Sequence, residues 1–367
     1  MEKRNVFDYL FWRSDLDFNQ DKFNEVDALI LNIVSFIDYK ELSIVYPSPS
    51  KIKLTELINN FFKENEGKKI SLGLIIPNEM IDVVISVAKS KRYKDIMVSN
   101  YVNNVDRVNT KQFSAMTFHL SDDSIFVSYK GTDDTLVGWA EDFSMLAEFP
   151  IPAQIDACKY LNDVALIYSN AKIYAGGHSK GGNLAIYSSL YAKEEIRNRI
   201  RRVYSFDGPG FLNDYLDKDL FNEMKSKISH IIPNGGIVGR LFTVPIEPII
   251  IKSYEKGLNQ HNPLSWIVNS SEFERVISFS KYSDNIKSAV DALISSMSLE
   301  DKIDFANDLQ VYLDNLKQEN LIEFLDFKNV ISLLFNKHRI KHKNMRYLIK
   351  LYRILKKNHA VIIKIQK

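Results

Sequence analysis

The sequence has little of several features that would restrict its class. Its 367 residues include a single cysteine, Cys158, which excludes an internal disulfide framework and fits a reducing compartment. No run of about 18 apolar residues occurs, so we expect no membrane-spanning helix. Charged residues interrupt the N-terminal segment too often for a secretory signal. These absences together predict a cytoplasmic protein.

The chain also lacks internal repeats, low-complexity segments and any group of histidine, cysteine and acidic residues with metal-ligand spacing. We therefore expect neither a metal nor a cofactor. Hydrophobic residues make up 45% and charged residues 26%, an ordinary globular balance that allows a large core without disulfides. The length fits one large domain with an extension.

Acidic side chains are missing from the end of the chain. No Asp or Glu occurs after Asp326, whereas residues 327–367 hold 12 Lys and Arg. Residues 1–326 therefore contain 36 Lys and Arg against 46 Asp and Glu, a net charge of −10. An acidic body with a basic tail bears on binding partners rather than on the fold.

Strand and helix patterns alternate between about residue 113 and residue 270. Strands are predicted where β-branched and aromatic residues cluster, at 113–120, 124–131, 171–177, 201–208, 228–233 and 247–254. Helices are predicted where apolar residues recur at helical spacing, at 23–37, 76–93, 155–168 and 181–196. This alternation predicts an α/β fold with a mostly parallel sheet. We expect an α/β domain over 1–270, a possible lid within 40–110, and a helical C-terminal region over 271–367.

A glycine-rich pattern, Gly177-His178-Ser179-Lys180-Gly181, lies between a predicted strand and a predicted helix. The pattern and its context are typical of a nucleophile elbow, in which a sharp turn exposes a serine above the sheet edge. We therefore predict Ser179 as a nucleophile and the backbone N–H of Lys180 as half of an oxyanion hole. The alternatives are a plain turn or a phosphate loop, but the residues of a phosphate-binding motif do not follow.

The other half of an oxyanion hole has to come from an earlier loop at a strand end. The predicted strand 124–131 is followed by Thr132 and Asp133. The N–H of Thr132 is expected to face the developing oxyanion, with its hydroxyl as a further donor, and each such donor contributes about 3 kcal/mol. The alternative is a turn that only ends the strand.

A serine nucleophile needs a base that accepts its proton. The seven histidines are His119, His178, His230, His261, His338, His342 and His359. His261 follows the last predicted strand, where the chain order nucleophile, acid, histidine would put the base, and we predict that role for it. His230 is the alternative. His178 is expected to point away from the site.

The acid that orients the base is less clear from the sequence. The usual position, after strand 228–233, holds Asn234 and no carboxylate. Asp207 ends the preceding strand, and an ionised carboxylate there would fix the tautomer of His261 and stabilise its cation. Two alternatives stay open: Asp207 only caps a turn, or the amide of Asn234 orients the imidazole.

Several motifs give the chain a family resemblance. They are Asp8-Tyr9-Leu10-x-Trp12-Arg13-x-Asp15-Leu16-x-Phe18, Phe23-Asn24-Glu25-Val26-Asp27, Gly177-His178-Ser179-Lys180-Gly181-Gly182-Asn183-Leu184-Ala185, Phe206-Asp207-Gly208-Pro209-Gly210-Phe211 and Gln260-His261-x-Pro263-x-Ser265-Trp266. In these motifs, which cover roughly residues 1–270, the chain resembles the Mbeg-like group of uncharacterised bacterial α/β hydrolases. The resemblance implies an α/β-hydrolase fold and an acyl-ester hydrolase without metal or cofactor.

The same group is distantly similar to the class 3 lipases. In those enzymes a strand ending in F-R-G-[ST] supplies the oxyanion residue, and Tyr129-Lys130-Gly131-Thr132 resembles that pattern. The resemblance implies the oxyanion role for Thr132. The chain departs from the lipases at Asn234, where they carry their acid, so either Asp207 replaces that acid or the triad is incomplete.

The basic tail contains an amphipathic helix pattern near residues 345–357, with apolar residues on one face and Arg346, Lys350, Arg353 and Lys357 on another. Such a helix docks on the acidic body, binds an anionic membrane surface, or contacts nucleic acid. Nucleic acid is the least favoured, because no recognition motif accompanies the charge.

The sequence thus predicts a serine hydrolase that cleaves a small-molecule or lipid ester, with Ser179, His261 and Asp207 as the triad and Thr132 and Lys180 as the oxyanion hole. A peripheral position at the membrane would suit a lipid substrate. A thioesterase or acyltransferase that uses the same serine is the first alternative. A non-catalytic lipid-binding or scaffold protein on the same fold is the second.

Overall fold

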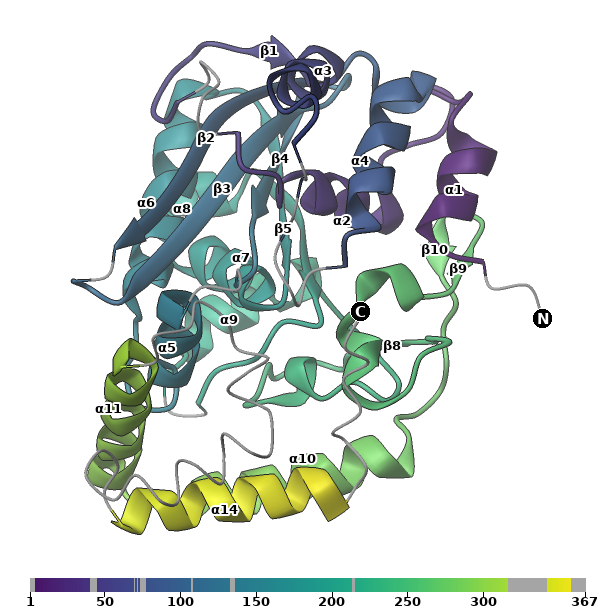
Figure 1. Ribbon diagram of the computed structural model, residues 1–367. Coiled ribbons are helices and arrows are strands. Elements are labelled where there is room, and N and C mark those ends of the chain that lie inside the picture. The colour runs from purple at the N-terminus through teal and green to yellow at the C-terminus, as the bar shows by residue number, and fades with distance from the viewer. Residues whose placement is uncertain are drawn as a thin grey trace.

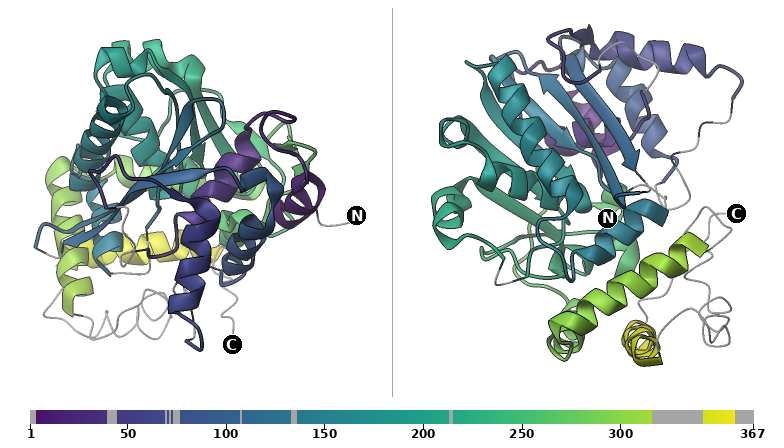
Figure 2. Two further views of the ribbon diagram at one scale, coloured as in Figure 1. Left: turned by 90° about the horizontal axis from the view of Figure 1, so that it is seen from above. Right: turned by 90° about the vertical axis from the view of Figure 1, so that its left-hand side faces the viewer.

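The computed structural model describes residues 4–39, 45–68, 70, 72, 77–106, 108–132, 136–212, 215–315 and 342–357. These residues form a central eight-stranded sheet with helices on both faces (Figures 1 and 2). The strands follow one another across the sheet in chain order: β1 (Ile52–Lys53), β2 (Met97–Asp106), β3 (Lys111–His119), β4 (Ser124–Tyr129), β5 (Lys172–His178), β6 (Ile200–Phe206), β7 (Ile228–Pro233) and β8 (Ile249–Ile251). The fold is therefore α/β, as the sequence predicts.

The sheet is mostly parallel, and this fixes where its loops meet. β4 to β8 run parallel, whereas β1, β2 and β3 join them through antiparallel pairs. The predicted hairpin is present as β3 and β4, with Ala115 opposite Tyr129. Because parallel strands end at one edge of a sheet, the segments after β4, β5, β6 and β7 lie together there. A separate two-stranded ribbon consists of β9 (Val268–Asn269) and β10 (Glu272–Phe273).

Helices cover the sheet. The described ones are α1 (Val6–Arg13), α2 (Glu25–Val34), α3 (Leu54–Glu64), α4 (Met80–Lys89), α5 (Leu136–Ser144), α6 (Pro152–Ile167), α7 (Lys180–Tyr191), α8 (Glu194–Arg197), α9 (Lys218–Met224), α10 (Lys281–Ser295), α11 (Leu299–Asn315) and α14 (His342–Lys357). Short 3-10 turns are η1 (Lys91–Tyr93), η2 (Lys225–Lys227), η3 (Val238–Arg240), η4 (Gly257–His261) and η5 (Pro263–Ser265).

Each face of the sheet carries its own core, because side chains alternate along a strand. On β4, Phe126 belongs to the core that α2 and α4 cover, whereas Ile125 and Val127 belong to the core under α6 and α7. All three side chains are buried. The sheet edge that carries the loops after β4 to β7 is thus held between two packed layers, which gives the candidate residues a rigid support.

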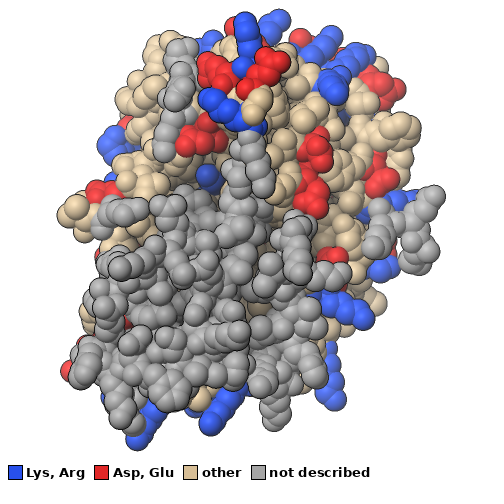
Figure 3. Space-filling model, in the orientation of Figure 1, with Lys and Arg blue, Asp and Glu red and all other residues tan. Residues whose placement is uncertain are grey.

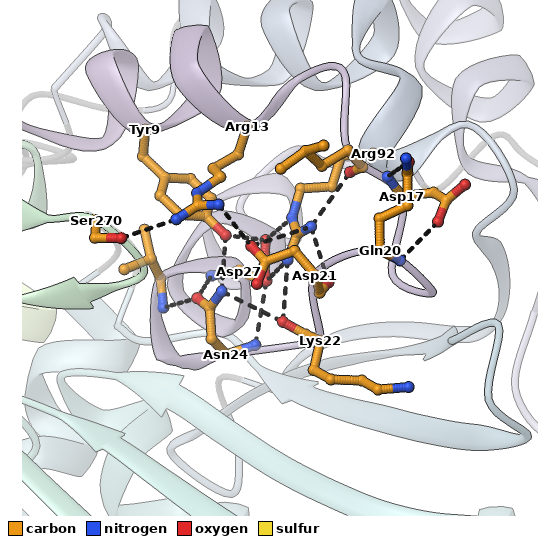
Figure 4. A network of polar contacts seen from close by, with 12 residues as sticks. Tyr9, Arg13, Asp17, Gln20, Asp21, Lys22, Asn24, Asp27, Arg92 and Ser270 are labelled. Atoms are coloured by element: carbon orange, nitrogen blue, oxygen red, sulfur yellow. Dashed lines mark hydrogen bonds and ion pairs between the residues drawn. The ribbon is translucent and has the colours of Figure 1, made fainter.

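A buried charge network joins the N-terminal helices (Figure 4). The guanidinium of Arg92 donates to both carboxylate oxygens of Asp27, at 2.7 Å and 2.6 Å, and neither side chain is exposed. The hydroxyls of Tyr9 and Tyr93 donate to the same carboxylate at 3.0 Å and 2.8 Å. The network connects α1, α2 and η1, so Tyr9 and Asp27 of the N-terminal motifs hold the fold together.

Some elements differ from the predictions. β2 was not predicted, because its second half carries Asn103 and Asn104, and asparagine is depleted in strands. The hydrogen bonds of the pairing with β3 stabilise this strand in spite of its weak local preference. The predicted helix 76–93 is shorter and consists of α4 followed by η1. Leu57 of α3 and Val83 of α4 are fully buried, so these helices of the 40–110 segment contribute to the core.

The C-terminal helices occupy the region that the sequence predicts to be helical. Ile286 and Val290 of α10 are buried, and Leu351 and Ile354 of α14 pack against the same small core. The ammonium of Lys343 on α14 also donates to the carboxylate of Asp301 on α11. These contacts dock α14 on α10 and α11, which is one of the three outcomes that the sequence left open.

Apart from Lys343, the basic side chains of α14 whose burial is described are not part of this contact. Arg346, Lys350 and Arg353 are exposed, and Figure 3 shows Lys and Arg side chains along the lower edge of the molecule, where α14 lies in Figure 1. Most of the predicted basic tail, residues 327–341 and 358–367, lies outside the described residues. Within the described part of the chain, no helix combines the length and the apolar character needed to cross a membrane.

Candidate active site

Ser179 occupies the sharp turn between β5 and α7. Its backbone has φ 57° and ψ −131°, a conformation that costs a residue with a side chain about 1–3 kcal/mol. The N–H of Ser179 donates to the carbonyl of Phe206 at the end of β6, at 2.9 Å, which holds the turn in place. Ser179 is partly exposed. The turn therefore presents the serine at the edge where the parallel strands end, in the geometry of an elbow.

Two glycines allow the elbow and the loop after β4 to approach each other. A Cβ on Gly181 would lie 2.2 Å from the carbonyl oxygen of Tyr129. A Cβ on Gly131 would lie 2.6 Å from the carbonyl oxygen of His178 and 3.3 Å from the Cβ of Ser179. No side chain fits at the shorter distances. The loop that begins with Gly131 therefore runs directly beside Ser179.

Asp207 and His261 come together through a short hydrogen bond. Nδ1 of His261 lies 2.6 Å from Oδ2 of Asp207. The Asp207 side chain is fully buried, whereas 25% of the His261 side chain is exposed. The other oxygen of Asp207, Oδ1, accepts the N–H of Gly239 at 2.9 Å. The carboxylate is thus held from both sides, and Nε2 of His261 is directed away from it.

His178 places His261 next to the elbow. The two imidazole rings have centroids 4.4 Å apart, and Nε2 of His178 donates to the backbone carbonyl of His261 at 2.8 Å. Burial, reinforced by the neighbouring His261, holds the pKa of His178 well below its usual range, so this ring is neutral. The expectation that His178 points away from the site is wrong. The ring supports His261, because the segment before α10 folds back over β5.

Asp207 also lies close to Ser179 through the backbone. It follows β6 with φ 46°, and its N–H donates to the carbonyl of Ile231 on β7 at 2.8 Å. A Cβ on the next residue, Gly208, would lie 2.9 Å from the carbonyl oxygen of Ser179. Ser179, Asp207 and His261 therefore meet at one edge of the sheet, from the segments after β5, β6 and β8.

Thr132 and Lys180 are the two residues that the sequence predicts for the oxyanion hole. Thr132 follows Gly131 in the loop after β4, and Lys180 is the first residue of α7. The hydroxyl of Thr132 donates to Oδ2 of Asp142 on α5, at 2.6 Å. Because a hydroxyl has one proton, it does not donate to a substrate in this arrangement, contrary to the sequence expectation. The oxyanion role of the backbone N–H groups of Thr132 and Lys180 stays a prediction.

The alternative base and the alternative orienting group lie elsewhere. His230 is fully buried on β7, where Nε2 donates to the carbonyl of Gly239 at 3.0 Å, and burial lowers its pKa to about 4. His119 lies at the opposite end of the sheet beside Ile125, near the start of β4. Asn234 uses its backbone N–H and carbonyl to join β8 and Ser280. Nδ1 of His261 is bonded to Asp207 and not to Asn234.

Sequence reasoning treated Lys180 only as a backbone donor and missed its side chain. The ammonium is buried and lies 2.9 Å from Oε2 of Glu141 on α5. Neither Glu141 nor Asp142 was predicted to have a role in the site. The sequence held one signal for these partners, the lysine itself. Because α7 is buried, an ammonium at its first residue needs a partner of opposite charge.

The described residues contain no group of three or more His, Cys, Asp and Glu side chains arranged to hold a metal ion. Among known families, the model described as Mbeg1-like matches residues 87–312, a range that includes the elbow, Asp207 and His261. No curated protein matches the chain. The motifs before residue 87 and α14 lie outside the matched range.

Proposed function

The chain belongs to the Mbeg1-like family, and from the geometry of its candidate site we propose that it is a serine hydrolase with the α/β-hydrolase fold. The proposed reaction is the hydrolysis of a carboxylic ester through an acyl-enzyme on Ser179. One observation carries this proposal: the buried carboxylate of Asp207 bonds His261 at 2.6 Å beside a serine on a strained turn. A serine, a histidine and a carboxylate in this relation are the parts of a hydrolytic triad.

The chemistry follows from which atoms remain available. Nδ1 of His261 is occupied by Asp207, so Nε2 accepts the proton of the Ser179 hydroxyl as its oxygen attacks the ester carbonyl. The N–H groups of Thr132 and Lys180 stabilise the resulting oxyanion. The imidazolium returns its proton to the leaving alcohol, and a water molecule then releases the acid from Ser179 by the same two transfers.

The position of Asp207 favours a complete triad, similar to that of the lipases, over an incomplete one. Asp207 follows β6, one strand before Asn234, yet its carboxylate contacts His261. The proposal is therefore that Asp207 replaces the lipase acid. A lipid or small-molecule ester would be the substrate, and the likeness of Tyr129-Lys130-Gly131-Thr132 to the class 3 lipases favours this class.

Two alternatives use the same site differently. A thioesterase or an acyltransferase would form the same acyl-enzyme, and rates on matched oxygen esters and thioesters separate them from an esterase. A non-catalytic scaffold or lipid-binding protein would keep the fold without turnover. The scaffold alternative rests on a missing catalytic acid. The bond between Asp207 and His261 provides a candidate for that acid and therefore speaks against the scaffold.

The experiment is labelling with a fluorophosphonate probe, followed by mass mapping of the modified residue. We expect modification at Ser179, loss of labelling in Ser179→Ala and strong reduction in His261→Ala. Ser86→Ala, which changes a serine on α4 whose hydroxyl bonds its own helix, is the matched control and should label normally. A folded protein that does not label at Ser179, even with detergent present, would contradict the proposal and favour the scaffold.

A further inference from the structure

The residue after the proposed nucleophile carries a buried charged side chain that the triad mechanism does not use. The Lys180 side chain is not exposed, and its ammonium donates to Oε2 of Glu141 at 2.9 Å and to the carbonyl of Gln112 at 3.0 Å. It also lies 3.8 Å from Oδ1 of Asp142. A buried ammonium is tolerated only with such partners, so this lysine is tied to α5 and to the start of β3.

Glu141 in turn is fully satisfied. Its side chain is also unexposed, Oε2 accepts the N–H of Gln112 at 3.1 Å, and Oε1 accepts the N–H of Ala153 at 2.9 Å. The carboxylate therefore fixes three segments at once: the start of β3, the start of α6 and, through Lys180, the start of α7. This arrangement anchors α5 against the elbow.

Asp142 links the same lysine to the other side of the site. Its Oδ1 faces the ammonium of Lys180 and its Oδ2 accepts the hydroxyl of Thr132 at 2.6 Å. Thr132 and Lys180 are the two residues whose N–H groups form the oxyanion hole in the function proposed above. Two contacts of Asp142 thus connect the proposed oxyanion residues through α5: a hydrogen bond from Thr132 and an ion pair with Lys180 at 3.8 Å.

We propose that the buried ammonium of Lys180 positions the oxyanion hole by holding Asp142, and with it Thr132, at a fixed distance from the elbow, a role that rests on the hydrolase function proposed above. Lys180 then acts twice: its backbone N–H contacts the oxyanion, and its side chain sets where the N–H of Thr132 lies. The side chain is a positioning group and does not touch the substrate.

A purely structural role is a weaker explanation of these contacts. Buried ion pairs add little to stability, and well-packed apolar residues of similar volume often replace them without loss. Oxyanion donors, in contrast, depend on distances of a few tenths of an ångström, and a misplacement of about 1 Å costs about 100-fold in rate. The contact between Asp142 and Thr132 is what a positioning role requires and a stability role does not.

The test separates turnover from binding and from folding. The double variant Lys180→Met with Glu141→Gln removes both buried charges and keeps side-chain volume. We expect its kcat on p-nitrophenyl butyrate to fall about 100-fold, with KM and thermal stability little changed. Lys159→Met with Asp163→Asn removes a lysine–aspartate pair on the surface of α6 and is the matched control, with kcat unchanged.

A second variant covers the case in which the double variant fails to fold. Asp142→Asn keeps an acceptor for the hydroxyl of Thr132 but loses the attraction to Lys180, at a side chain that is only partly buried. We expect an intermediate loss in kcat, about tenfold, again without change in KM.

The outcomes distinguish this role from the proposed function. If the native protein labels at Ser179 and both variants keep the native kcat, the positioning role is wrong and the hydrolase stands. If kcat falls only together with the melting temperature, or if KM rises by the same factor, the contacts are structural and the positioning role is again wrong. If the native protein neither labels nor hydrolyses the ester, the proposed function fails first, and this role fails with it.

Discussion

Asp207 is held so that a single oxygen faces the base. Oδ1 accepts the N–H of Gly239 and Oδ2 bonds Nδ1 of His261, while the whole side chain is buried. Its positive φ of 46° brings the side chain to this position directly after β6. A Cβ on Gly239 would lie 2.4 Å from Oδ1, so the loop after β7 closes on the carboxylate without space for any other partner.

We predict that Asp207→Asn lowers kcat on a soluble ester by about 10³- to 10⁴-fold, because an amide can hold the wrong tautomer of His261 and cannot stabilise its cation. Steady-state kinetics with circular dichroism as the folding check measures this. Asn234→Ala is the control, and we expect it to stay within about threefold of the native rate. The assignment of the acid would be reversed if Asn234→Ala were the more damaging of the two.

The residues of the candidate site differ in how far the sequence could predict them. Ser179 was predictable, because an elbow is a local pattern of strand, glycine-flanked serine and helix. Asp207 stayed open, since any strand of the parallel sheet can deliver a carboxylate to the same edge. The partners of Lys180 were not predictable, because local spacing does not say in which direction a long side chain leaves an elbow.

At the scale of elements, the N-terminal helices depend on one buried ion pair (Figure 4). Arg92 joins η1 to Asp27 of α2, and it also donates to the carbonyls of Leu16, Asp21 and Lys22 in the loop between α1 and α2. Leu16 and Asp27 belong to two of the motifs that carry the family resemblance, and these contacts give both motifs a local structural role. The helices that these contacts join cover the core on one face of the sheet.

We predict that Arg92→Met lowers the free energy of unfolding by about 3–5 kcal/mol, because it leaves the Asp27 carboxylate buried without its cation. Urea denaturation measures this. Adding Asp27→Leu should recover much of the loss, since the pair is then replaced by apolar side chains.

Arg197 and Glu223 provide the matched control for that cycle. Arg197 donates from Nε and Nη2 to the two oxygens of Glu223, both at 3.0 Å, which is the same forked geometry on the surface. Because solvent screens this pair, Arg197→Met should cost at most about 1 kcal/mol. An equal cost for the buried and the exposed arginine would contradict the role given to the network.

The docking of α14 restricts which of its side chains can contact a membrane. Leu351 and Ile354 pack toward α10, so they do not insert into lipid while the helix stays docked. The exposed Arg346, Lys350 and Arg353 remain to meet an anionic surface. Deep burial of an apolar face, the usual mode of an amphipathic helix, is therefore not the mode we expect.

We predict that sedimentation with anionic vesicles, if it occurs, is abolished by high salt and by changing Arg346, Lys350 and Arg353 together to Ser. Each basic side chain near such a surface contributes about 1 kcal/mol, and this contribution is screened within a Debye length. Neutral vesicles are the control. Binding that survives high salt would mean that α14 undocks and inserts its apolar face.

At the scale of the whole molecule, the parallel order of strands was predictable and its antiparallel extension was not. Strands and helices alternate in the sequence from β4 onward, which requires parallel pairing, and the chain order of β4 to β8 follows. β2 belongs to the sheet because it pairs with β3, and β1 because it pairs with β2, although neither carries a strong strand pattern of its own. The sheet is therefore wider than the sequence indicates.

Three histidines of the same sheet are buried or, for His119, partly buried, and this gives the stability a defined pH dependence. His178 at the elbow, His230 on β7 and His119 on β3 all have a lowered pKa, with burial as the main cause. The pKa of His230 falls to about 4 and that of His119 to about 3, the latter also because Lys51 lies near. His230 and His119 are therefore neutral in the folded protein at pH 5, and the lowered pKa of His178 acts in the same direction.

In the unfolded chain the same histidines accept protons below a pKa of about 6.5. The unfolded state then binds more protons than the folded state, so the free energy of unfolding falls as the pH falls below that value. The loss should amount to roughly 1 kcal/mol per pH unit for each histidine, and it begins before most carboxylates titrate. We predict that urea denaturation between pH 6.5 and 5 shows this slope in the free energy of unfolding.

His119→Gln, which keeps a polar atom near Ser99, should reduce the slope by the contribution of one histidine. A slope that is unchanged in His119→Gln would mean that this ring is protonated in the folded protein, and the burial argument for it would be wrong.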